Sequence, residues 1–146
     1  MSLDIGRADP IPPADKTYLD TSYVCVRWVG GGPWVLIEWK AWANSQEFRA
    51  AHEIVLTALR ENHASRNLID AADARVVSNE DQHWLIESWI PRAAAAGRRW
   101  TAVVMPKSAL ARTVSENIDK SPRTNLTKVE YFDTVDEAAA WLSTVS

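Results

Sequence analysis

The sequence predicts an α/β domain in the order β-β-α-β-α-β-α-β-α, with a mostly parallel mixed sheet that begins with a hairpin and helices packed on the sheet. Two observations predict this fold class. Residues 23–29 and 34–40 alternate apolar and polar side chains on either side of a Gly-rich turn, which is typical of a β-hairpin. Beyond them, short apolar runs alternate with segments of helical periodicity, which favours parallel strands joined by helices.

The chain of 146 residues fits one domain, and 47% hydrophobic with 24% charged residues is usual for a globular one. We expect residues 1–16, which are polar and Pro-rich, to form a flexible tail, and residues 17–146 to form the domain. A net charge of −3 favours no nucleic-acid partner. Without a signal peptide or a run of roughly 20 apolar residues, we expect a cytoplasmic protein with no membrane span.

The remaining elements follow from start and stop signals in the sequence. Asn44 or Ser45 is a suitable N-cap for the first helix, and Gly97 is a suitable stop after the second. Pro91 lies inside that second helix; because proline lacks a backbone N–H and disfavours α geometry at the residue before it, we expect a kink or break at Ile90. The predicted ranges are helix 46–62, strand 66–72, a helix from about Asn79, strand 98–106, helix 107–120, strand 128–133 and a last helix from Thr134.

Polar residues follow the predicted parallel strands, where open sheets of this kind bind ligands. The candidate ligand or regulatory residues are Asp70, Asp73, Arg75, Ser78, Lys107, Ser108 and Arg112. The side chains of Asp70, Asp73, Asp81 and His83 would suit a metal site or acid–base chemistry only if they converged in space. We favour a structural interpretation, in which Asp70 ends a strand, Asp73 bonds its own backbone in a turn, and Asp81 offsets a helix dipole.

Three further features each allow a structural and a functional interpretation. Ser78 is an N-cap, with Asp81 at the capping-box position, or a phosphate acceptor. Lys107, Ser108 and Arg112 form a solvated helix face or hold an anion. His52 lies beside Phe48 and Val55 on one helix, where we expect a core-edge histidine bonded to a neighbour rather than a ligand. In each case we favour the structural interpretation.

The second helix is apolar on more than one side and contains Trp84, Ile86, Trp89 and Ile90. These residues suit three roles: plain core, an interface with a second copy or partner, or the lining of a pocket for an apolar ligand. Self-association and plain core remain equally open. The chain contains eight tryptophans, a residue enriched in interfaces and pockets.

The order of elements resembles the SpoIIAA-like fold, which is shared by STAS domains (anti-sigma-factor antagonists) and, more loosely, by CRAL-TRIO lipid-binding domains. The resemblance covers roughly residues 20–145 and is closest to uncharacterised bacterial STAS-like proteins, through "NLIDAADARVVSNEDQHWLIESWIPRAAAAGRRWTAVVMP" and "FDTVDEAAAWL". A phosphorylatable STAS domain would carry an Asp-Ser pair and a glycine at the start of the second helix. Here Ala71 and Ala72 follow Asp70, so the phosphorylation switch does not match.

From the order of elements, the resemblance and the absence of a catalytic constellation in the sequence, we expect a non-enzymatic regulatory module that acts through protein–protein contact as a homodimer, with no cofactor and no metal. The alternative is a carrier of a small apolar or lipid-like ligand in a Trp-lined pocket. An enzyme that uses the Asp and Ser residues at the strand ends is a third, less favoured hypothesis.

Overall fold

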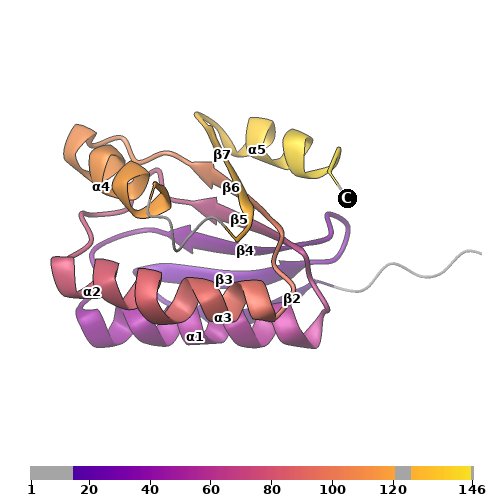
Figure 1. Cartoon of the computed structure of the whole chain (residues 1–146). Coiled ribbons are helices and arrows are strands. Elements are labelled where there is room, and N and C mark those ends of the chain that lie inside the picture. The colour runs from indigo at the N-terminus through magenta and orange to yellow at the C-terminus, as the bar shows by residue number, and fades with distance from the viewer. Residues whose placement is uncertain (1–14, 121–125, 146) are drawn as a thin grey trace, which may run out of the picture.

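A six-stranded mixed sheet forms the centre of the protein in the computed structural model, which describes residues 15–120 and 126–145 (Figure 1). In sheet order the strands are β2 (Lys16–Asp20), β3 (Val24–Val29), β4 (Trp34–Trp39), β5 (Arg66–Asp70), β6 (Trp100–Val104) and β7 (Lys128–Phe132). The first three pair antiparallel, and the pairs from β4 to β7 are parallel. The predicted fold class is confirmed, including the hairpin at its start.

The edge strand β2 was not predicted from the sequence. It pairs antiparallel with β3, and its register shifts between Thr17 and Leu19. A strand of five residues with an irregular register and two partly buried side chains shows little apolar alternation, so its sequence contains no clear strand signal. Just before this strand, Asp15 Oδ1 accepts a hydrogen bond from the Gly30 amide at 2.9 Å. Residues 1–14 of the expected tail lie outside the described residues.

Side-chain caps begin the main helices. Asn44 and Glu47 form a reciprocal capping box for α1 (Ser45–Glu61), which fixes Asn44 as the N-cap. Ser78 Oγ accepts the Asp81 amide at 3.2 Å at the start of α2 (Asn79–Trp84). Ser108 and Thr134 cap α4 (Ala109–Asp119) and α5 (Val135–Leu142) in the same way.

The helix that contains Pro91 does not break. α2 continues through a π-helical turn, η1 (Leu85–Trp89), into α3 (Ile90–Ala95), and Ile90 keeps helical dihedral angles of −59° and −44°. Its amide donates to the Leu85 carbonyl, five residues back. The wider turn places Pro91, which has no N–H, where the helix changes its hydrogen-bond pattern, and so it accommodates the ring without the predicted break. Gly97, with a φ of 111°, ends the helix as predicted.

Three helical segments pack on one face of the sheet and a single helix on the other. Because β4 to β7 lie side by side in chain order, right-handed crossovers place α1, α2–α3 and α4 on the same face. Figure 1 shows α1 and α2–α3 running alongside one another. The core on this face includes Val26, Val55, Trp89 and Ile118, whereas α5 buries Leu142 against Leu68 on the opposite face.

Candidate functional site

A cavity of about 390 Å³ lies on the three-helix face, between the sheet, the η1–α3 segment and α4. Thr101 and Val103 form part of its floor, because alternate residues of a strand face the same side. The other side chains that enclose it include Ile69 and Val129 from the sheet, Leu85, Trp89 and Ile90 from the helix that contains Pro91, and Ala111, Ser115 and Ile118 from α4. The enclosure is therefore mostly apolar.

The outer end of the cavity lies at the carboxyl edge of the parallel strands. Trp42 and Val76, which are 65% and 44% exposed, line it there. Two of the predicted candidate residues, Arg75 and Ser78, line the same end and are exposed. The edge expected from the topology rule is thus where the cavity meets solvent. Pro106, just after β6, lines the outer end, and Thr101, near the start of β6, lines the inner end. The two residues lie about 16 Å apart along the strand.

The other candidate residues at this edge do not converge on one site. Asp70 Oδ1 accepts the Ala72 amide at 3.2 Å, so the Asx-type contact in this turn belongs to Asp70. Asp73, predicted to bond its own backbone, instead accepts a hydrogen bond from Lys107 Nζ at 3.0 Å. Arg112 lies 3.9 Å from the Asp133 carboxylate, and Ser108 caps its helix. The cations expected to hold an anion therefore face carboxylates.

Asp81 connects the starts of two helices. Its carboxylate is buried, and Oδ1 accepts hydrogen bonds from Ser45 Oγ at 2.5 Å and Arg49 Nε at 2.9 Å. Burial raises the pKa of Asp81, but the hydrogen bonds from Ser45 and Arg49 outweigh it and leave the pKa below its ordinary value. This link was not predicted from the sequence, because more than 30 residues separate Asp81 from Ser45 and Arg49.

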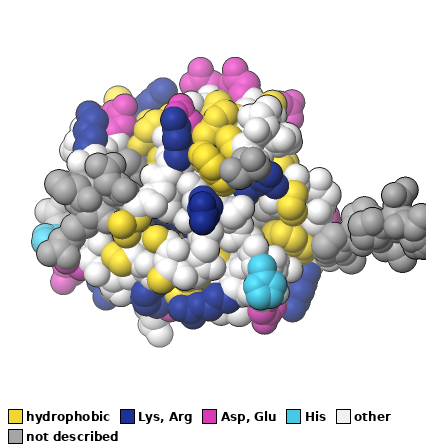
Figure 2. Space-filling view, turned by 45° about the vertical axis from the view of Figure 1, so that its right-hand side comes forward, with side chains coloured by type: hydrophobic (Ala, Val, Ile, Leu, Met, Phe, Trp, Pro, Cys, Tyr) yellow, Lys and Arg dark blue, Asp and Glu magenta, His cyan; other side chains and the backbone are white. Residues whose placement is uncertain are grey.

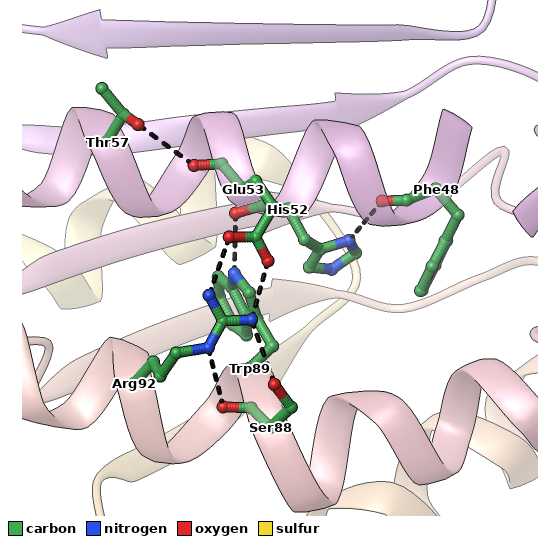
Figure 3. Close-up of polar contacts among 7 residues, drawn as sticks. All are labelled: Phe48, His52, Glu53, Thr57, Ser88, Trp89 and Arg92. Atoms are coloured by element: carbon green, nitrogen blue, oxygen red, sulfur yellow. Dashed lines mark hydrogen bonds and ion pairs between the residues drawn. The ribbon is translucent and has the colours of Figure 1, made fainter. Parts of the chain in front are cut away.

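His52 lies at the centre of the aromatic wall of the cavity. It is buried, and its Nδ1 lies 2.9 Å from the Phe48 carbonyl oxygen (Figure 3). Burial lowers the pKa of His52 from 6.5 to about 4, so the ring is neutral at pH 7. Because a carbonyl only accepts, Nδ1 holds the ring proton and Nε2 is an acceptor. The hydrogen bond to a neighbour that the sequence predicts for this histidine is therefore present, but the side chain is buried in the core and not at its edge.

Trp89 and Arg92 join the helix that contains Pro91 to α1. Trp89 Nε1 donates to the His52 carbonyl oxygen at 2.6 Å, and its ring meets the imidazole edge-on at 4.9 Å. One turn on, Arg92 makes two hydrogen bonds of 2.7 Å to the Glu53 carboxylate (Figure 3). These contacts fix the aromatic wall of the cavity.

The four predicted interface or pocket residues divide into two pairs. Trp89 and Ile90 are 3% and 6% exposed and serve both as core and as cavity lining. Trp84 and Ile86 are half-buried and do not line the cavity. The guanidinium groups of Arg49 and Arg92 lie over the Trp84 ring, at 5.4 and 6.0 Å from its centroid.

Two polar side chains at the inner end of the cavity were not predicted as site residues. Thr101 is 2% exposed, and its hydroxyl has no hydrogen-bond partner among the described residues. Arg98 is 5% exposed; its Nη1 donates to Asn67 Oδ1 at 3.2 Å and its guanidinium lies over the Trp89 ring at 5.0 Å. No local pattern marks either residue, because both lie in an ordinary predicted strand segment.

Other kinds of site find less support in the described part of the chain. Among those residues, no three His, Cys, Asp or Glu side chains gather as a metal site would require. None of the described helices has the length and apolar character needed to cross a bilayer. On the face drawn in Figure 2, hydrophobic side chains form separate groups with charged residues between them.

The comparisons with known proteins add no family. No family model, no curated protein and no solved structure matches the chain. The resemblance to STAS-like proteins therefore stays a prediction from the order of elements and the sequence patterns.

Proposed function

We propose that the protein binds a small, largely apolar molecule in the cavity beneath the helix that contains Pro91. The observation that supports this most is the cavity itself: at about 390 Å³ it lies in the range of small-molecule sites, and aromatic and aliphatic side chains enclose most of it. This is the alternative function expected from the sequence, with Trp89 and Ile90 in the wall.

The state of the polar groups favours binding over catalysis. A general base needs a pKa near the working pH and a free path to the substrate. The pKa of His52 is about 4, and its Nδ1 faces the Phe48 carbonyl. The carboxylate of Asp81 is held by Ser45 and Arg49. We therefore propose a binding protein rather than an enzyme that uses the acidic residues at the strand ends.

The test is calorimetric titration with octanol, a neutral probe with an apolar tail. We expect binding with a negative heat-capacity change, because apolar surface is buried. Ala111→Phe places a ring in the cavity and should abolish binding, whereas Ala109→Phe on the exposed side of the same helix should not. If Ala111→Phe does not fold, Ser115→Phe and its exposed neighbour Glu116→Phe form a second pair. Equal binding to both members of a pair, or none to the parent protein, would contradict the proposal.

A second candidate function is the STAS-like module that acts through protein contact. The exposed Trp42 and Val76 support it, since both lie at the carboxyl edge of the sheet. The form of this module that we propose is a homodimer. Its interface would be either this edge of the sheet or the surface around the half-buried Trp84 and Ile86. Light scattering after size exclusion tests it: a single 16.3 kDa species at high concentration rules out the homodimer.

A further inference from the structure

The inner end of the cavity contains a buried hydroxyl that the described residues leave unsatisfied. Thr101 faces the cavity from β6 and is only 2% exposed. Its Oγ1 has no hydrogen-bond partner among those residues. Buried polar groups are hydrogen-bonded in the great majority of structures, so such a hydroxyl calls for a partner. The open side of this one is the cavity, so a bound molecule can supply it.

A positive charge lies beside that hydroxyl. Thr101 and Asn67 are register partners on β6 and β5, and Arg98 donates to the Asn67 side chain. Gly97 ends α3 and turns the chain, so that the Arg98 guanidinium lies over the Trp89 ring and lines the cavity. The inner end therefore presents two kinds of hydrogen-bond donor, a hydroxyl and a guanidinium, both of which suit a carboxylate.

The outer end differs in charge and in polarity. It presents the exposed side chains of Arg75 and Glu80, which are opposite in charge, and the exposed apolar side chains of Trp42 and Val76. The Asp81 carboxylate beside them is paired with Arg49. A carboxylate gains no net positive field there, whereas an alkyl tail gains apolar contact. The two ends thus favour one orientation of an amphiphilic ligand, with its head inside.

We propose that the ligand is a small amphiphilic carboxylic acid whose carboxylate binds Thr101 and Arg98 at the inner end, while its apolar tail extends toward Trp42. This inference rests on the proposed function, because it names the class of ligand for the same cavity. It adds that Thr101 and Arg98 recognise the head group of the ligand.

The test compares three ligands that share one tail: octanoate, octanol and octylamine, titrated by calorimetry at pH 7. We expect octanoate to bind about tenfold more tightly than octanol, as one charge-assisted hydrogen bond would give, and octylamine to bind most weakly. Equal affinities, or tightest binding of octylamine, would overturn the head-group proposal and leave the apolar cavity intact. If none of the three binds, the proposed function itself fails.

Substitutions at Thr101 locate the head. Thr101→Val should weaken octanoate about tenfold and leave octylamine unchanged, while Thr101→Ser, which keeps the hydroxyl, should retain octanoate binding. Thr57→Val, on an exposed part of α1, is the matched control. Without ligand, Thr101→Val should also raise the denaturation midpoint, because it removes an unpartnered hydroxyl. Unchanged octanoate affinity, or a lowered midpoint, would contradict the assignment.

Discussion

The two faces of the sheet achieve burial in different ways. On one face α5 alone covers β5 to β7, and Leu68, Ala138 and Leu142 are at most 1% exposed. On the other face three helical segments cover the sheet, yet a cavity of about 390 Å³ remains. Since α4 presents small or polar residues such as Ala111 and Ser115 to that space, it encloses the cavity without filling it. More helices therefore do not mean closer packing, and the looser face is where we place function.

Matched leucine truncations test this comparison with the largest expected effect. Leu142→Ala should lower the free energy of unfolding by about 4 kcal/mol, because a fully buried side chain leaves a new void. Leu85→Ala should cost only about 2 kcal/mol, because one side of Leu85 already faces the cavity and has fewer contacts to lose. Urea denaturation without ligand measures both. Equal losses would mean that the two faces are packed alike.

The cavity face should also respond to pH through His52. Its pKa falls from 6.5 to about 4 on folding, so the unfolded chain binds the proton first as pH drops. The stability from the neutral ring is complete above pH 6.5 and decreases toward pH 4, by roughly 3 kcal/mol in all. Denaturation curves across this window should lose that slope in His52→Gln and keep it in the exposed His83→Gln. The same slope in both variants would contradict the assignment.

The sequence predicts the elements better than it predicts the site. Alternation in residues 23–29 and 34–40 and the helix caps depend on neighbours in the chain, and the structure agrees with them. The helical spacing of Leu110, Val114 and Ile118 predicts a buried stripe on α4. That prediction is only partly right, because Leu110 is 63% exposed while Ile118 is buried. The π-helical turn at Leu85–Trp89 and the cavity depend on how far apart elements stand, and no local pattern encodes that spacing.

The candidate residues show the same division. Arg75 and Ser78 could be placed at the carboxyl edge because topology alone decides which loops meet there. Thr101 and Arg98 could not be found, because their interest lies in burial and in a missing hydrogen-bond partner for the hydroxyl. Sequence patterns thus predict residues at the carboxyl edge of the sheet, but they do not predict the polar residues inside the cavity.

The Asp81 link between α1 and α2 supports the wall of the cavity, with a smaller expected effect. Asp81→Asn should lower the free energy of unfolding by about 2 kcal/mol at pH 7, because the buried acceptor of Ser45 and Arg49 loses its charge. Arg49 is 40% exposed, so solvent screening limits the contribution of the ion pair. Asp133→Asn is the control, since its carboxylate is 84% exposed and 3.9 Å from Arg112. A similarly small change in both variants would show that the link is not stabilising.

A small apolar molecule that binds this protein should occupy the space beneath the helix that contains Pro91. Nuclear Overhauser contacts between octanoate and the methyl groups of the protein measure where the ligand lies. We predict contacts to Ile69, Val103 and Ile118, which line the cavity from the sheet and from α4. Contacts confined to exposed methyl groups such as those of Leu110 and Val135, or no contacts at all, would rule out binding in the cavity.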